Sequence, residues 1–488
     1  MAATGMLTYF CRPSIKLFEY SPFRVLTALV VFTLFKINRK ERSMRFPKLR
    51  LLLAIGFAGA ISNQTVMADE LSDAVAADYD QHLAALYDYF HRNPELSSME
   101  FKTAARLAEE IRAAGFDVTE GVGGTGIVAM MKNGPGPLVM MRADMDGLPV
   151  PEKSGLPNAS KATQIDWDGN EVPVMHACGH DVHITSLVGT ARYMAAHKDT
   201  WSGTLMLIGQ PAEERINGAK GMMDDNLWER FGKPDYALAF HVSSGVPTGK
   251  LVAVVGAPMS GADTVDIIIH GVGAHGASPH RGVDPVVLGS QIVLALQTVI
   301  SRELAPREAG VITVGSFHAG TKHNIISDKA HLQLTVRNDN LETRELLLAG
   351  IKRVAENMGR VAGLPEDMLP EVIVSPESVP PTINDNELTQ RLRSVWKKEL
   401  GEDIFYEAKR SGMGAEDFPY FTIDPYIAST YFAVGGTPQA DFDAEAEGGP
   451  AVPSHHSPLF KVNGEESVTL GVEATVIALQ NLLQVIAK

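Results

Sequence analysis

The chain has 488 residues, of which 45% are hydrophobic, and a formal net charge of −15. This length is enough for a large core and roughly two domains. The 43 Lys and Arg residues form no basic block after the N-terminal region, which argues against nucleic acid as a partner.

The N-terminal region contains two short apolar runs, 25–35 and 51–61. Each is shorter than the ~20 residues that span a membrane as a helix. Residues 44–68 have the form of a secretory signal, with a basic start, an apolar middle and a small-residue end at Ala68. We therefore expect an upstream extension at 1–43, a signal peptide at 44–68 and a periplasmic or secreted mature protein with no stable membrane partner. An N-terminal membrane anchor is the alternative.

The two cysteines, Cys11 and Cys178, offer no disulfide framework. Because Cys11 falls in the predicted extension, we expect Cys178 to be free or bound to a metal.

From Ser72 onward the hydrophobic pattern alternates between helices and strands. The predicted helices are 73–91, 103–114 and 185–196, and the predicted strands are 126–132, 137–142, 204–208 and 236–241. This alternation is typical of an α/β domain with a mostly parallel sheet flanked by helices.

A second pattern begins near Met259. Its predicted strands are 264–271, 311–317 and 330–337, and its helices are 285–304 and 341–358. This order predicts a smaller α+β domain, at 259–370, inserted in the first. The main domain is then expected at 72–258 and 371–488, ending in a helix at 468–485.

Segment 175–183 contains three histidines, Cys178 and Asp181. Thiolate and imidazole are the ligands that zinc and similar divalent ions prefer. Gly179 would let Cys178 and His180 face one ion from a tight loop. A single cysteine is often a small buried hydrophobe instead, but the density of ligands here favours metal binding.

Acidic pairs follow two of the predicted strands. Glu213 and Glu214 come after the strand at 204–208, and Asp144 and Asp146 come after the strand at 137–142. In parallel sheets ligands bind beyond the carboxyl ends of strands, so we expect one shared site. In the glutamate pair, one carboxylate would bind a metal and the other would act as general base. One aspartate would orient a histidine ligand, and aspartate capping of a turn is the alternative.

Further candidates come from later in the chain. His241 ends a predicted strand and His455 and His456 lie near the C-terminus; with the ligands above they complete a set suited to two ions. His275, in a loop of the inserted domain, is either an oxyanion donor or an ordinary turn residue. Asn324 and Arg337 are candidates for binding a substrate carboxylate.

The glycine motif at 121–126 matches G-x-G-x-x-G, but a strand-like run follows it. This context argues against dinucleotide binding, which requires a helix at that point.

Several motifs, taken in order, resemble the amidohydrolase branch of the M20 metallopeptidase family. This branch includes hippurate hydrolases, N-acyl-amino-acid amidohydrolases and plant auxin-conjugate hydrolases. The matching segments are Arg-Ala-Asp-Met-Asp-Gly-Leu-Pro at 142–149, His-Ala-Cys-Gly-His-Asp-Val-His at 176–183, Gln-Pro-Ala-Glu-Glu at 210–214, His-Val at 241–242, 273–280 and His-Ser-Pro at 456–458. The resemblance covers the chain from about Ser72 to its end.

The resemblance implies a role for each matching residue. The metal ligands would be Cys178, His180, Glu214, His241 and His456. Glu213 would be the general base and Asp146 the supporting aspartate. His275 would bind substrate or stabilise the oxyanion, in some relatives across a dimer, and Asn324 would lie near the substrate carboxylate. The inserted domain would act as a lid and dimerisation domain, compatible with a homodimer or homotetramer.

The expected activity is hydrolysis of the amide bond of N-acyl amino acids or related small conjugates by metal-activated water. Two divalent ions per subunit are expected, of zinc, manganese, cobalt or nickel. One alternative is a dipeptidase or aminoacylase of the same metal class, and another is a non-catalytic extracytoplasmic binding protein. Ser243, Ser244 and Ser327 depart from the family pattern and leave the acyl group open.

Overall fold

The computed structural model of the chain describes residues 70–407, 410 and 412–484. The predicted extension, signal peptide and alternative membrane anchor lie outside the described residues, as does Cys11. They therefore stay predictions from the sequence.

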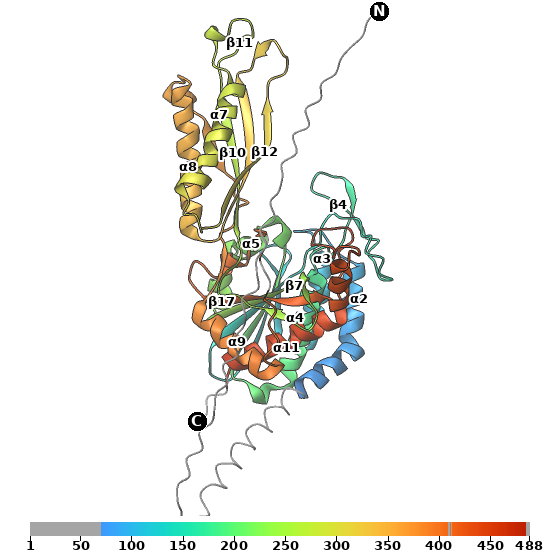
Figure 1. The fold of residues 1–488 in the computed structure, drawn as a ribbon. Helices are drawn as coiled ribbons and strands as arrows, with labels where there is room; N and C mark the ends of the chain where they lie inside the picture. The colour runs from blue at the N-terminus through green and yellow to red at the C-terminus, as the bar shows by residue number, and fades with distance from the viewer. Residues whose placement is uncertain (1–69, 408–409, 411, 485–488) are drawn as a thin grey trace, which may run out of the picture. The chain divides into compact units, whose positions relative to one another are not determined.

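A seven-stranded sheet with the order β1-β2-β6-β3-β7-β17-β8 forms the centre of the larger domain (Figure 1). The strands are β1 (Asp117–Val122), β2 (Gly126–Asn133), β3 (Leu138–Asp144), β6 (Gly203–Gln210), β7 (Tyr236–Pro247), β8 (Leu251–Val252) and β17 (Ala428–Thr437). The four central strands β6, β3, β7 and β17 run parallel, and antiparallel pairing is confined to the flanks. The predicted mostly parallel sheet of an α/β domain is confirmed.

Helices cover both faces of this sheet because successive side chains of a strand point to opposite faces. In β6, Leu205 and Leu207 pack into one core, whereas Met206 and Ile208 pack into another. The first core includes α2 (Ala84–Arg92), α3 (Phe101–Ala113), α4 (His180–Ala196), α9 (Asn386–Leu400) and α11 (Gly464–Leu482). The second includes α5 (Gly218–Asp224) and α6 (Leu227–Phe231).

Helix α4 begins at His180, five residues before the predicted start. Its first three turns are buried on all sides, so the segment lacks the polar stripe by which a surface helix is recognised. Gly179 precedes the helix with a left-handed φ of 84°. His180 therefore lies on the helix and not, as predicted, in the loop that carries Cys178.

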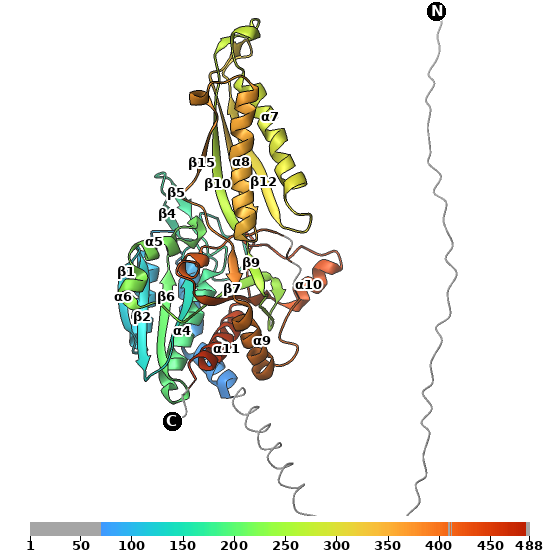
Figure 2. The ribbon, with the colours of Figure 1, turned by 90° about the vertical axis from the view of Figure 1, so that its left-hand side faces the viewer.

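The smaller domain contains an antiparallel sheet with the order β12-β14-β10-β15. Its elements are β10 (Gly261–His270), α7 (Pro285–Thr298), β12 (Gly310–Ala319), β14 (Lys329–Asn338), α8 (Leu341–Val361) and β15 (Glu371–Val374). Helices α7 and α8 run along the sheet (Figure 2) and pack on it through a separate core. Because β15 pairs with β10, this domain extends to Val374, and the boundary predicted at 370 is too early.

Helix α7 and its continuation to Glu303 have the length and hydropathy of a membrane span, with 19 residues and a mean hydropathy of 1.3. Leu288, Ile292 and Leu296 of this helix are buried in the core of the smaller domain. A core helix passes the same test, so this single helix is weak evidence for a span.

The glycine motif at 121–126 forms the turn between β1 and β2, which pair antiparallel. A strand follows it, as expected, so it is not a dinucleotide-binding turn.

Candidate metal centre

Potential ligands gather where the parallel strands end. Strand β3 ends at Asp144, β6 ends just before Glu213, and β7 carries His241. This is the edge at which parallel sheets bind ligands. The main-domain candidates named from the sequence therefore come from one edge of the sheet.

Two groups of ligand atoms share the sulfur of Cys178. One group is Cys178, His180 and His241, and the other is Cys178, Glu214 and His456; within each group the atoms lie within 4.8 Å of one another. Cys178 Sγ lies 3.4 Å from His241 Nε2, and His456 Nε2 lies 3.3 Å from Glu214 Oε2. The structure thus brings together every residue that the sequence predicted as a metal ligand.

Hydrogen bonds to backbone carbonyls fix the tautomers of two of these histidines. His180 Nδ1 lies 2.8 Å from the Asp146 carbonyl oxygen, and His241 Nδ1 lies 2.6 Å from that of Val242. A carbonyl only accepts hydrogen bonds, so each Nδ1 carries the proton. In the neutral ring each Nε2 then has the lone pair through which imidazole binds a metal.

Two buried acceptors in the cluster, His180 Nε2 and Glu214 Oε1, have no hydrogen-bond partner among the described residues. They lie 4.0 Å apart. At this distance the two atoms are not hydrogen-bonded to each other. A divalent cation would satisfy both, and the mixture of sulfur, imidazole nitrogen and carboxylate oxygen fits zinc and similar ions.

Buried carboxylates around the cluster exceed the available positive charge. Arg142, fully buried, donates to Asp144 at 2.6 Å, to Glu416 at 2.7 Å and to Asp417 at 3.4 Å. Glu213 has a carboxylate oxygen within 4.8 Å of those of Glu416 and Asp417. Burial, and then the Glu416 carboxylate, hold the pKa of Glu213 well above its ordinary value. Cations bound at Cys178 and Glu214 would offset this negative charge.

The ligands respond to the same environment. Burial, followed by the charges of Glu214 and Glu213, raises the pKa of the Cys178 thiol well above its ordinary value. Burial alone would lower the pKa of His180, but Asp144, Asp146 and Glu214 together raise it to about 10. A thiolate at Cys178 therefore requires a nearby positive charge.

Asp144 and Asp146 form hydrogen bonds with residues of the cluster. Asp146 accepts hydrogen bonds from His180 Nδ1 at 3.2 Å and from the Glu214 backbone N–H at 3.0 Å. Asp144 lies 2.5 Å from His183 Nδ1, while His183 Nε2 accepts from the Val242 N–H at 2.8 Å. Asp146 thus orients two ligands, which is the supporting role predicted for it, and His183 is occupied on both nitrogens.

His455 also belongs to the site, although the family resemblance gave a ligand role only to its neighbour His456. The Ser244 N–H donates to its Nε2 at 3.2 Å, so its Nδ1 carries the proton and faces Cys178 Sγ at 3.6 Å. Burial holds the pKa of His455 well below its ordinary value, which keeps the ring neutral. The only sequence signal was its place beside His456, and adjacency does not show which ring faces the sulfur.

A cavity of about 680 Å³ opens onto the cluster. Glu213 and the candidate ligands other than His180 line one part of it, and Arg337 reaches it from the smaller domain. Arg337 is half-buried, which lowers its pKa, and its Nε donates to Thr335 Oγ1 at 3.2 Å. The remaining wall includes the aliphatic side chains of Val246, Val252, Val254, Met259 and Met413.

His275 and Asn324 do not line this cavity. They lie together at a small two-stranded antiparallel sheet, where His275 pairs with Ile325 and the Gly276 N–H donates to the Asn324 carbonyl at 2.8 Å. This small sheet adjoins the end of β10 and the start of β14, whereas Arg337 lies near the opposite end of β14. Ten extended residues span about 30 Å, so within one chain these two candidates are separated from the ligands.

The fold and the site define a two-domain α/β protein in which a cluster of Cys, His and Glu side chains able to hold cations lies beside a buried carboxylate, the composition of a metal-dependent hydrolase. Comparison with known proteins agrees. The model of the peptidase family M20/M25/M40 matches residues 140–447. The hippurate hydrolase of Campylobacter jejuni is 35% identical over 333 residues, 68% of this chain and 82% of that protein.

Two further relatives support the same assignment. The IAA-amino acid hydrolase ILR1-like 2 of Arabidopsis thaliana is 32% identical over 377 residues, 76% of this chain and 79% of that protein. The solved structure of a protein described as an aminohydrolase from methicillin-resistant Staphylococcus aureus has a TM-score of 0.74 to this chain and is 30% identical to it. The match covers 85% of this chain and 100% of that one. The chain belongs to the M20 peptidase family, in its amidohydrolase branch, and is a hydrolase of amide C–N bonds.

Proposed function

We propose that the protein hydrolyses the amide bond of N-acyl amino acids or related small conjugates, using two divalent cations held by Cys178, His180, Glu214, His241 and His456. The observation that carries this proposal is the pair of ligand groups sharing Cys178, with Glu213 beside them in the same cavity. The names of the hippurate and IAA-amino acid hydrolases indicate substrates of this class for those relatives.

Bound cations would lower the pKa of a water molecule and polarise the scissile carbonyl. Glu213 accepts a proton from the attacking water as the water oxygen bonds to the carbonyl carbon. Glu213 then returns this proton to the nitrogen as the C–N bond breaks, which releases a carboxylic acid and an amine. Arg337 binds the substrate carboxylate, and the aliphatic wall of the cavity receives an apolar part of the substrate.

Replacing the general base tests the proposal. Glu213→Gln keeps the side-chain shape but cannot take up the proton, so kcat should fall about 10²- to 10⁴-fold. Metal content, measured by elemental analysis after reconstitution, should stay at the wild-type level because Glu213 is not a ligand. Zinc, manganese, cobalt and nickel should each be restored to stripped protein, and N-acyl amino acids compared with dipeptides.

A non-catalytic binding protein of this fold would bind the substrate without hydrolysis in every metal form. A dipeptidase would prefer substrates with a free α-amine. Wild-type turnover of Glu213→Gln would exclude Glu213 as the base.

We further propose that the protein is exported and forms a homodimer or homotetramer. The apolar run at 51–61 with its flanking residues supports export, and the N-terminal sequence of the mature protein tests it. Apolar side chains on the outside of the smaller domain support association: Leu294 on α7 is 72% exposed and Phe317 on the edge strand β12 is 38% exposed.

A further inference from the structure

Glu213 and Glu214 lie on a single 3₁₀ turn, Glu213–Arg215, directly after β6. The residues at its two ends, Ala212 with φ 50° and Ile216 with φ 56°, have a left-handed backbone. Residues other than glycine rarely adopt this conformation and keep it only where their surroundings hold them. The turn that presents the proposed base and a proposed ligand therefore depends on external contacts.

Glu100 supplies such a contact at Ala212. Its Oε1 accepts the backbone N–H groups of Ala212 and Ser98, each at 2.8 Å, and its Oε2 accepts the Thr125 hydroxyl at 2.5 Å. The Glu100 residue is fully buried, with 0% exposure. Ser98 also has a left-handed φ, of 64°. The Glu100 carboxylate thus hydrogen-bonds to the backbone of two residues, Ala212 and Ser98, whose left-handed conformation depends on such contacts.

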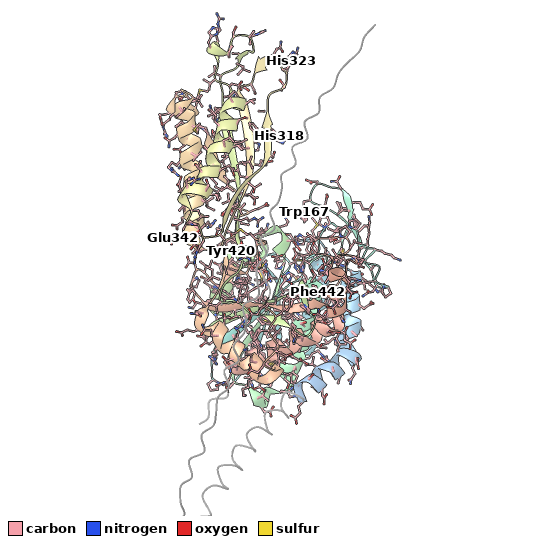
Figure 3. The ribbon with its side chains drawn as sticks, in the orientation of Figure 1. Trp167, His318, His323, Glu342, Tyr420 and Phe442 are labelled. Atoms are coloured by element: carbon pink, nitrogen blue, oxygen red, sulfur yellow. The ribbon has the colours of Figure 1, made fainter. Side chains whose placement is uncertain are left out.

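The segment 97–100 also contacts the turn on its other side. Ser97 Oγ donates to Asp146 Oδ2 at 2.6 Å, and the Glu214 N–H donates to the same oxygen at 3.0 Å. Trp167, labelled in Figure 3, donates from its indole to the Ser97 carbonyl at 3.3 Å. The Arg215 guanidinium lies 4.4 Å from the centre of the Trp167 ring. Segment 97–100 is therefore connected to the turn before Glu213, at Glu214 and at Arg215.

We propose that Glu100 is a positioning residue for the Glu213 and Glu214 pair. Its carboxyl group holds Ala212 in the left-handed conformation, and this sets the direction in which the turn leaves β6. Glu100 acts through geometry, because its hydrogen bonds go to backbone N–H groups and a hydroxyl and not to the Glu213 or Glu214 side chains. The proposal rests on the proposed roles of Glu213 and Glu214.

Three substitutions of Glu100 distinguish a role of its hydrogen-bond geometry from a role of its charge. Glu100→Ala removes the contact, and Glu100→Asp keeps the charge but is one methylene too short to reach both Ala212 and Thr125. In both, we expect kcat to fall about 10- to 100-fold, since misplacement of catalytic groups from a distance has effects of this size, while KM stays within about twofold. Glu100→Gln can keep Oε1 on both N–H groups while the Thr125 hydroxyl accepts from its amide. We expect this variant to keep at least about half of wild-type kcat.

A second readout does not depend on turnover. Hydrogen exchange of the backbone amides of residues 212–217, measured by mass spectrometry on metal-free protein, should be faster in Glu100→Ala and Glu100→Asp and unchanged in Glu100→Gln. Glu95→Ala is the matched control. Glu95 Oε2 also accepts three hydrogen bonds near the start of α3, from Lys102 N–H and from the N–H and hydroxyl of Thr103, but it contacts no part of the turn. This control should leave both kcat and the amide exchange of residues 212–217 unchanged.

The proposal would be overturned if Glu100→Ala kept the wild-type exchange rates and the wild-type kcat. It would also be overturned if Glu100→Asp were active and Glu100→Gln inactive, because this result would indicate that the charge of Glu100 matters. An equal loss in Glu95→Ala would overturn it too. If Glu100→Ala does not fold, the comparison of Glu100→Asp with Glu100→Gln tests the proposal in its place. A fully active Glu213→Gln would refute the proposed function but leave the exchange experiment as a test of Glu100.

Discussion

At the scale of single residues, the site depends on groups that touch the ligands as well as on the ligands. Cys178 lies between His241 and His455, and only His241 has a free lone pair directed toward the cluster. His455 instead presents an N–H to the sulfur. A hydrogen bond of this kind stabilises a thiolate and fixes its direction.

Replacing His455 should therefore weaken metal binding without removing a ligand. In His455→Phe the ring volume is kept and the N–H donor is lost, and we expect the dissociation constant for the cation to rise about 10- to 100-fold. Competition with a chromogenic chelator measures this constant. His318→Phe, which changes an exposed histidine of the smaller domain (Figure 3), is the control. An unchanged constant in His455→Phe would exclude the contact as a determinant of affinity.

The candidate ligands could be identified from the sequence because they carry local signals. Cys178 and His180 share one short motif, while Glu214 and His241 follow apolar strand runs. The roles of Arg142, His455 and Glu100 could not be predicted in this way, because these roles depend on partners far along the chain. Arg142 and Glu416, for example, are 274 positions apart.

At the scale of elements, the start of α4 places His180. The main-chain turn at Gly179 is left-handed, and a Cβ added there would overlap the Val242 side chain of β7. Close approach of α4 to β7 thus depends on a residue without a side chain.

Gly179→Ala should destabilise the fold and displace His180. The left-handed backbone alone costs roughly 1–2 kcal/mol for alanine, and overlap with Val242 adds to this cost. Gly169→Ala is a matched control, since Gly169 has a similar φ of 85° and nothing within 4 Å of its added Cβ. Urea unfolding of both metal-free variants should show a larger loss for Gly179→Ala, and only this variant should bind the cation more weakly. Equal losses of unfolding free energy in the two variants would mean that small shifts relieve the overlap between the added Cβ and Val242.

The elements were predictable where amphipathic or apolar patterns are regular, as in the strands β2, β3, β6 and β7. The early start of α4 was missed because its first three turns are buried and carry no polar stripe. The boundary at 370 was missed because the short strand β15 belongs to the smaller sheet only through its long-range pairing with β10.

At the scale of the whole molecule, the smaller domain separates His275 from the cluster in its own chain. The length of β10 and β14 makes this a property of the fold and not of a side-chain rotamer. His275 can serve the site only if another copy of the chain supplies it, which requires a dimer of the kind proposed above.

Mixing two inactive variants tests this arrangement. Glu213→Gln lacks the base, and His275→Ala lacks the oxyanion donor, so each alone should be impaired. If His275 acts on the partner's site, a mixed dimer contains one site with both groups intact, and activity should recover to roughly a quarter of the wild-type level after exchange of subunits. Size-exclusion chromatography with light scattering establishes that dimers form. No recovery in a preparation shown to contain mixed dimers would place His275 outside the partner's site.

The sulfur of Cys178 is common to both ligand groups, and residues 70–484 contain no other cysteine. Oxidation of this one atom would remove a ligand from both groups at once. Within that part of the chain no second thiol is present to capture the oxidised sulfur as a disulfide, so protection would depend on external thiols. Loss of activity under peroxide should therefore follow a single chemical event, and the cations should slow it by occupying the thiolate.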